Sequence, residues 1–436
     1  MKQRIRFANL HIVLSTSLIL TLNALAYPSP FIQPVHAQPS ISDANLNVQA
    51  VVEGLSSPTS MIFLDNNIIL VLEKEGNVRL VTNGILQEQP VLQIPVNVEG
   101  ERGLLGVAIS TGIRGPNNTN IFLYYTEVDP IRNRVYKYQW NGETLVNSTL
   151  LLDLPAEPIP IHVGGKITIG PDGYLYVVIG DLNHGGQLQN FPDGQPPDDT
   201  GSIFRINPED GSAAPGNPFV SSRKDDSMSK YYAYGIRNSF GIDFDPLTGN
   251  LWDTENGLAS YDEINLVRPG FNSGWYAVMG PILLSEVTED DLVNFPGSHY
   301  ADPLFSWIDT VAPTDIEFFS STKLGDRYTN NIFVGDITRG NLYLFEVNEN
   351  RDGLIFDTAQ QKIGLSDLVV NSEKELSSIT FGNGFGGVTD IETGPDGFLY
   401  VLSYDEDIET GPDGSLNILS YDDGIIYKIS SNNTTQ

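Results

Sequence analysis

Short apolar runs of four to seven residues recur along the chain and are separated by Gly, Pro, Asn and Asp. The runs are rich in Val, Ile, Leu, Phe and Tyr, and long helical periodicity is scarce, which is the pattern of strands joined by turns. We expect strands at seven runs in particular: Asn67–Glu73, Val78–Thr82, Ile121–Thr126, Tyr174–Gly180, Asn250–Thr254, Asn331–Val334 and Phe398–Tyr404. The chain is therefore predicted to be all-β.

One short motif recurs along the chain, a Gly-Pro-Asp-Gly turn followed by an aromatic or apolar strand. It occurs at Gly170–Gly173, Gly394–Gly397 and Gly411–Gly414, with a looser version at Asp245–Gly249. Pro presets one turn residue, Asp bonds to the backbone and Gly takes a positive φ. Recurring turn-and-strand units predict a β-propeller, and about 60 to 65 residues per blade suits six blades, although seven or eight also fit the spacing. With no interior linker, we expect one propeller domain over residues 45–430. Residues 392–405 are nearly repeated at 409–422, which we interpret as a small duplication in the last blade.

The N-terminus has the pattern of a secretory signal peptide. Lys2, Arg4 and Arg6 precede the apolar stretch Ile12–Leu22, and small residues before and at Ala37 suit cleavage there. Cleavage after Ala26 and an uncleaved anchor are the alternatives. No later segment is apolar enough to span a membrane. We expect residues 1–37 to be removed and the mature chain to be secreted, extracellular or periplasmic.

The composition limits the kinds of molecule that the protein can bind and the chemistry that it can carry out. The 436 residues carry a formal charge of −31, and the first 37 contain three cations and no acid, so the rest is still more acidic. Such a surface repels phosphate backbones, which excludes nucleic acid as a partner. The absence of cysteine excludes disulfides, thiolate metal sites and cysteine catalysis. The composition selects no oligomeric state.

Several segments between residues 54 and 276 together resemble the glucose/sorbosone dehydrogenase family, which includes the soluble pyrroloquinoline-quinone (PQQ) sugar dehydrogenases. The segments are Gly54–Pro58, Glu73–Arg79, Glu101–Gly106, Tyr124–Glu127, His162–Gly165, Gly180–Asp181, Tyr234–Asn238, Asp262–Leu266 and Gly274–Trp275. Their order and spacing are more specific than any one of them. The resemblance implies a six-bladed propeller with its active site at one mouth of the central channel.

Three residues are candidates for the chemistry. A neutral imidazole can take a hydroxyl proton while hydride leaves the same carbon, and the resemblance assigns that role to His162. A guanidinium and an amide can bond a quinone rim, and the resemblance places Arg237 and Asn238 beside the cofactor. The alternatives are a structural histidine bonded to a loop carbonyl and an arginine paired with a carboxylate between blades.

A calcium site is expected in the loop that follows Glu255. Calcium takes six to eight oxygen ligands, and a Gly-containing loop offers carbonyls without obstruction. The resemblance implies that the carbonyls of Gly257 and Leu258 hold the ion, with Asp262 and Glu263 nearby; Leu258 stands where the family has proline. A solvated acidic loop is the alternative.

The departures from the family concern the cofactor. The resemblance implies an Arg-x-Arg pattern that anchors the carboxylates of PQQ, and this chain has Gly387 and Thr389 at those positions. The lysine expected one blade earlier falls near Thr338, with Arg339 as the nearby substitute. Charge-assisted bonds to Arg are the strong ones, so PQQ is expected to bind poorly.

The leading hypothesis is a PQQ- and calcium-dependent sugar dehydrogenase acting on an aldose C1 hydroxyl. The second is a non-catalytic cell-surface propeller that binds glycan or protein. A calcium-dependent lactonase is the third, on fold analogy alone.

Overall fold

The computed structural model describes residues 38–110, 119–219, 227–410 and 416–432, without the side chains of residues 227, 405–410 and 416–423. The expected signal peptide and its cleavage site at Ala37 lie outside the described residues. In the described ranges nearly all regular structure is strand. The prediction of an all-β chain is confirmed.

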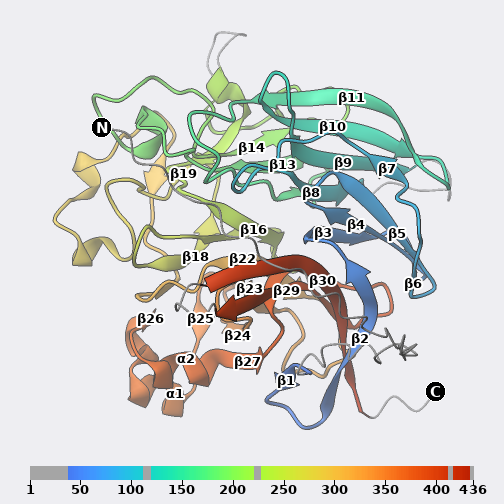
Figure 1. The fold of residues 1–436 in the computed structure, drawn as a ribbon. Coiled ribbons are helices and arrows are strands. Elements are labelled where there is room, and N and C mark those ends of the chain that lie inside the picture. The colour runs from blue at the N-terminus through green and yellow to red at the C-terminus, as the bar shows by residue number, and fades with distance from the viewer. Residues whose placement is uncertain (1–37, 111–118, 220–226, 411–415, 433–436) are drawn as a thin grey trace, which may run out of the picture. The chain divides into compact units, whose positions relative to one another are not determined.

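The strands form six sheets (Figure 1). The first contains β3 (Pro58–Phe63), β4 (Ile68–Glu73), β5 (Asn77–Thr82), β6 (Ile85–Leu86) and β7 (Leu92–Gln93). The second contains β8 (Leu104–Ile109), β9 (Thr119–Thr126), β10 (Asn133–Trp140) and β11 (Leu145–Leu154). The third contains β12 (Ile167–Ile169), β13 (Leu175–Ile179), β14 (Ser202–Ile206), β15 (Tyr231–Tyr234), β19 (Phe271–Asn272) and β20 (His299–Tyr300).

The other three sheets follow along the chain. The fourth contains β16 (Ser239–Phe244), β17 (Leu251–Glu255), β18 (Asp262–Val267), β21 (Phe305–Trp307) and β26 (Val369–Val370). The fifth contains β22 (Pro313–Phe319), β23 (Asn331–Asp336), β24 (Leu342–Val347), β25 (Leu354–Ile355), β27 (Thr380–Asn383) and β1 (Ser40–Ile41). The sixth contains β28 (Gly387–Thr393), β29 (Leu399–Thr410), β30 (Leu416–Ser431) and β2 (Leu46–Leu55).

The first strands of the sheets form a ring. Each of β3, β8, β12, β16, β22 and β28 packs against the next, and β28 packs against β3. The outer strand of the sixth sheet comes from the other end of the domain, because β2 pairs antiparallel with β30, as in Val48 opposite Ile429. This is a propeller-like fold.

The recurring turn phrase has the same geometry at two places. The Asp172 carboxylate accepts the Tyr174 backbone N–H at 3.1 Å and the Tyr176 hydroxyl at 3.0 Å. The Asp396 carboxylate accepts the Phe398 N–H at 3.1 Å and the Tyr400 hydroxyl at 2.9 Å. Both tyrosine rings then pack on the neighbouring sheet, Tyr176 against Phe244 of β16 and Tyr400 against Phe63 of β3. The repeat therefore shapes a turn and supplies an aromatic contact between sheets.

The two α-helices of the described ranges pack against each other, and α2 contacts β24 of the fifth sheet. Helix α1 (Thr358–Ile363) begins after Asp357, whose carboxylate accepts the N–H groups of Ala359 and Gln360, and α2 (Glu373–Ile379) begins after Ser372. Neither is long or apolar enough to span a bilayer, nor is any other helix of the described ranges. Short 3₁₀ turns lie at Gln187–Gln189, Ser227–Lys230, Ile282–Leu284, Glu289–Asp291 and Leu365–Asp367.

Candidate active site

His162 lies at the centre of a buried polar cluster just before β12. Its Nδ1 is 2.6 Å from Oδ1 of Asp181, and its Nε2 is 2.8 Å from Nη2 of Arg237. A guanidinium only donates, so Nε2 must be the acceptor and Nδ1 must carry the proton that is given to Asp181. The bonding therefore selects the neutral tautomer whose lone pair is on Nε2, the form that a general base needs.

The backbone around His162 is held by Glu101 and Asn238. His162 has a φ of +56°, and its N–H donates to Oε2 of Glu101 at 2.7 Å. The same oxygen accepts Nδ2 of Asn238 at 3.1 Å, and Oδ1 of Asn238 accepts the Gly164 N–H at 3.2 Å. These bonds offset a conformation that is costly for a non-glycine residue. They also bring Asn238 into the same cluster as His162 and Arg237, the two residues beside which the sequence analysis placed it.

Arg237 is buried between carboxylates and an indole ring. Its Nη1 donates to the Asn256 carbonyl at 2.7 Å, and its guanidinium lies 5.3 Å from the ring centre of Trp275. Burial lowers the pKa of Arg237, and the nearby carboxylates of Asp181, Glu255 and Glu101 oppose that shift. Its Nε has no partner among the described residues. Arg237 therefore keeps one buried N–H available for an acceptor.

Asp181 is a site residue to which the sequence analysis assigned no role. It joins two elements, because its Oδ1 contacts His162 and its Oδ2 accepts Nε1–H of Trp275 at 2.7 Å. The backbone leading to it is tightly enclosed: a Cβ at Gly180 would lie 2.3 Å from the His162 carbonyl oxygen and 2.8 Å from that of Arg237. The Gly180–Asp181 motif was the available signal, since only glycine permits this approach.

Of the four residues expected around calcium, Asp262 stays bonded to the Gly257 loop and Glu263 turns away from it. Oδ1 of Asp262 accepts the Gly257 N–H at 2.8 Å, and its Oδ2 accepts the N–H groups of Val311 at 2.6 Å and Ala312 at 2.7 Å. Glu263 faces the other side of β18, where its Oε1 accepts the Gly280 N–H at 2.5 Å. Adjacent strand residues point to opposite faces, so the two carboxylates do not converge.

Oxygen donors for a cation remain in the loop itself. Leu258 is 64% exposed, and Oδ1 of Asn256 is buried without a partner among the described residues. An unpartnered buried oxygen on the residue that precedes Gly257 and Leu258 suits a hard cation. No group of three or more His, Cys, Asp or Glu in the described ranges has metal-binding geometry, so carbonyl and amide oxygens would have to supply the ligands.

A pocket of about 450 Å³ opens beside this cluster at the mouth of the ring. Glu101, Gly164 and Gly165 line it on the side of His162, and Pro58, Val98, Leu105, Phe240 and Ile337 give it apolar walls. Lys74 and Lys166 are the cations among its described lining residues, and Glu75 and Glu101 are the anions. The pocket is thus mainly apolar, with balanced charge.

Lys166 separates this mouth pocket from a cavity of about 190 Å³ farther along the axis, which it also lines together with Asp243, Glu317 and Glu392. Its Nζ is 2.8 Å from Oδ1 of Asp315 on β22 and 2.5 Å from Oδ1 of Asp390 on β28. The side chain thus reaches from the residue before β12 to the first strands of two other sheets.

The residues at the mouth do not fit a tricarboxylate. Lys166 is already paired with two carboxylates, and Nζ of Lys74 donates to the Gly100 carbonyl at 2.7 Å. The structure does not bring Arg339 to the mouth: its Nη1 contacts Glu373 of α2 at 2.9 Å, and it lines a separate surface pocket. Thr389 lines the mouth pocket without a charge, and Gly387 has no side chain. The cluster around Arg237 could meet a quinone edge, but the anchoring cations are missing.

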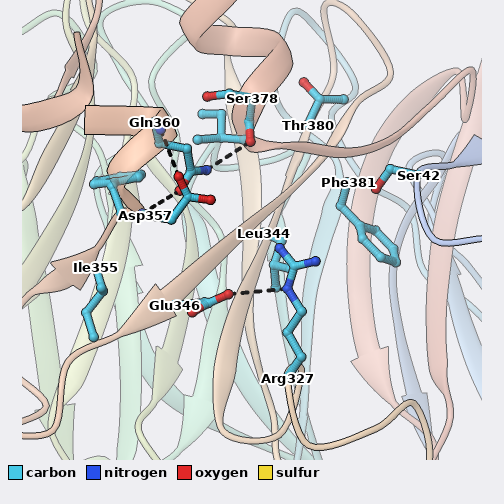
Figure 2. A pocket seen from close by; sticks show the side chains of 12 residues that line it. Ser42, Arg327, Leu344, Glu346, Ile355, Asp357, Gln360, Ser378, Thr380 and Phe381 are labelled. Carbon is cyan, nitrogen blue, oxygen red and sulfur yellow. Dashed lines mark hydrogen bonds and ion pairs between the residues drawn. The ribbon is translucent and has the colours of Figure 1, made fainter. Parts of the chain in front are cut away.

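A smaller cavity of about 90 Å³ lies beside α1 and the fifth sheet (Figure 2). Its polar lining is internally satisfied, since Arg327 Nε contacts Glu346 at 3.3 Å and Gln360 donates to the Ser378 carbonyl at 3.0 Å. None of the predicted site residues lines it. It therefore contributes nothing to the candidate site.

Comparisons with known proteins point to one family. Residues 55–419 match the glucose/sorbosone dehydrogenase family. Aldose sugar dehydrogenase YliI of Escherichia coli K12 is 26% identical over 83% of this chain and 90% of its own. Quinoprotein glucose dehydrogenase B of Acinetobacter calcoaceticus is 29% identical over 62% of this chain and 59% of its own. The crystal structure of a Thermus thermophilus oxidoreductase (glucose dehydrogenase) has a TM-score of 0.66 at 30% identity and covers 88% of this chain and 99% of its own.

Proposed function

Because this chain belongs to the glucose/sorbosone dehydrogenase family, we propose that it oxidises the C1 hydroxyl of an aldose, with His162 as the base. The observation that carries the proposal is the buried chain of contacts from Asp181 through His162 to Arg237, which leaves the lone pair of the imidazole on Nε2. We also propose that the six sheets are the six blades of a propeller and that the mature protein is exported.

The proton step uses residues of this chain alone. The C1 hydroxyl gives its proton to Nε2 of His162 while Asp181 stabilises the imidazolium through the Nδ1–H bond. Arg237 occupies Nε2 in this structure, so the hydroxyl must displace its Nη2 first. The freed guanidinium then donates a hydrogen bond to the C1 oxygen, on which negative charge develops as the proton leaves. Trp275 keeps Asp181 in place through its Nε1–H.

The hydride from C1 must go to a bound two-electron acceptor. PQQ is the acceptor implied by the family. At the positions where the family has arginines that anchor it, this chain has Gly387 and Thr389. Each charge-assisted bond contributes about 1.5–3 kcal/mol, so losing two weakens binding on the order of 10²–10⁴-fold. We expect PQQ to bind this protein far less tightly than the family pattern implies. Calcium, if bound, would take the carbonyls of Gly257 and Leu258 and the Asn256 amide oxygen, with Asp262 holding the loop.

The test combines PQQ binding with turnover. The purified protein is titrated with PQQ in calcium and with EDTA, and aldoses are scanned for dye reduction. We expect calcium-dependent turnover at high PQQ concentration that His162→Ala lowers by about 10²–10⁴-fold. The variant should also lose about 1–3 kcal/mol of stability, because Asp181 and Arg237 each lose a buried partner. His299→Ala, a histidine outside the cluster, should retain activity. Absence of sugar oxidation at saturating PQQ, or full turnover in His162→Ala, would overturn the proposal.

The missing cations also favour a second function, a propeller that binds glycan without oxidising it. Lys74 and Lys166 are both engaged within the protein, which leaves the mouth pocket suited to a neutral ligand. Saccharide binding in the absence of PQQ, together with no dye reduction in its presence, would select this function.

A further inference from the structure

The mouth pocket does not suit the cofactor of the family, but it has the size and the walls of a ligand site. Its volume of about 450 Å³ lies within the range of roughly 300–1,000 Å³ that is typical of small-molecule pockets. Two of its apolar wall residues, Val98 and Ile337, are 45% and 37% exposed. A ligand with an apolar body would remove this surface from water, which favours binding.

Most of the hydrogen-bond donors that line the mouth pocket are already used within the protein. The hydroxyl groups of Thr59 and Thr314 donate to backbone carbonyl oxygens at 2.8 and 2.6 Å, and that of Ser60 donates to a carboxylate at 3.1 Å. The backbone N–H groups of Gly164 and Gly165 also donate within the protein, at 3.2 and 3.1 Å. Both lysines of the lining are engaged as well. An anion needs such donors, so the pocket is poorly suited to one.

Acceptor oxygens, by contrast, remain available in the mouth pocket. The bonds that Glu101 accepts from the His162 N–H and from Asn238 both go to Oε2. A carboxylate has about four acceptor positions, so Glu101 can also accept a hydroxyl group from a ligand. Glu75 lines the same pocket and is exposed, and a serine or threonine hydroxyl that donates can still accept. The pocket therefore suits a molecule that donates hydrogen bonds.

We propose that the mouth pocket binds a neutral hydroxylated aromatic ring, a phenol or a naphthol, whose hydroxyl group donates to Glu101. The ring covers the apolar walls, and Phe240 and Tyr404 of the lining can pair with it, since aromatic rings attract one another edge to face. The net charge of −31 disfavours an anionic ligand. The inference goes beyond the proposed function, because it assigns a ligand class to the pocket and requires no reaction.

The experiment compares matched naphthalene probes by equilibrium dialysis against the purified protein without PQQ. The probe 2-naphthol carries a neutral hydroxyl donor, 2-methoxynaphthalene has the same rings without the donor, and 2-naphthoate is an anion. We expect 2-naphthol to bind about tenfold more tightly than either of the other two, because only 2-naphthol donates to Glu101 without bringing a negative charge. Maltose, which has no apolar body, should bind more weakly than 2-naphthol.

Two variants locate the probe in the mouth pocket. Thr389→Arg places a cation at a lining position, so it should tighten 2-naphthoate binding by about tenfold and should not tighten 2-naphthol binding. Thr322→Arg adds the same charge on an exposed turn outside the pocket and is its matched control. Ile337→Ser removes an apolar wall and should weaken 2-naphthol binding by about threefold. Ile85→Ser, at an exposed position on β6, should leave the binding unchanged.

The outcomes separate this inference from the proposed function. Equal binding of the three naphthalene probes, or tighter binding of maltose than of 2-naphthol, overturns the inference. So does 2-naphthol binding that both pocket variants leave unchanged together with unchanged 2-naphthoate binding, because the probe then lies elsewhere. Sugar oxidation that depends on His162, without 2-naphthol binding, retains the dehydrogenase and rejects the aromatic ligand. The reverse result retains the aromatic ligand and rejects the dehydrogenase. Unchanged melting temperatures confirm that the variants are folded.

Discussion

Replacing Lys166 with methionine should destabilise the ring more than any other single lysine change in the described chain. Nζ of Lys166 lies between Asp315 and Asp390, whose side chains are each 1% exposed. Burial alone would lower the pKa of Lys166, but Asp315 and Asp390 raise it well above its usual value. The lysine is therefore charged in the folded state.

Methionine fills much of the same volume but leaves both carboxylates without their cation. Removing one partner of a buried ion pair costs about 3–5 kcal/mol, because an uncompensated charge stays behind. Part of the cost is avoided if Asp315 takes up a proton. Burial already raises the pKa of Asp315 well above its usual value, and Lys166 opposes that shift, so its removal raises the pKa further.

The assay is the free energy of unfolding from denaturant titrations at pH 5 and pH 8, with Lys374→Met as the matched control on the exposed face of α2. The folded variant binds protons that its unfolded chain has lost, so its stability falls as pH rises. The deficit of Lys166→Met should therefore be larger at pH 8. A loss within about 0.5 kcal/mol of the control, or a larger deficit at pH 5, would refute the reasoning.

Three further outcomes follow from the site and the axis. Asp181→Asn should lower kcat for sugar oxidation by about 10²–10⁴-fold, since an amide can donate to His162 Nδ1 and select the wrong tautomer; equal turnover at all pH values would contradict this. Gly180→Ala should cost about 1–3 kcal/mol in urea titrations, because its Cβ would meet the carbonyl oxygens of His162 and Arg237 at 2.3 and 2.8 Å; unchanged stability would mean that the loops bearing His162 and Arg237 can move apart. Burial raises the pKa of Asp243 to about 6, so the stability that this group contributes is present below about pH 4 and is lost as pH rises through 6. Asp243→Asn should therefore remove up to about 3 kcal/mol of the decline in unfolding free energy between pH 4 and 8. An undiminished decline would assign it to other groups.

Local pattern predicted the strands well. The strands expected at 121–126 and 331–334 lie within β9 and β23. The strand expected at 398–404 begins one residue before β29. Turn chemistry and alternating burial are local properties, so they can be read from neighbours in the chain. The pairing of β2 with β30 joins the two ends of the described domain, and no local pattern specifies such a partner.

The site was predicted in part for the same reason. His162, Arg237 and Asn238 meet as expected, because each belongs to a motif with a fixed local backbone. The separation of Asp262 from Glu263 follows from the two-residue period of a strand and could have been predicted once β18 was recognised. Two other features could not have been predicted, because they link residues far apart in the chain. They are the ion pair of Arg339 with Glu373 and the contacts of Lys166 with Asp315 and Asp390.

The pairing of β2 with β30 makes the order of synthesis matter. Leu46–Leu55 is among the first segments of the domain to be made, yet its hydrogen-bonding partner is among the last. Until β30 is available, β2 has an open edge and the sixth sheet lacks its junction with the rest of the ring. The ring can therefore close only after nearly the whole chain has been made, and a premature stop before residue 424 would leave a product that cannot close.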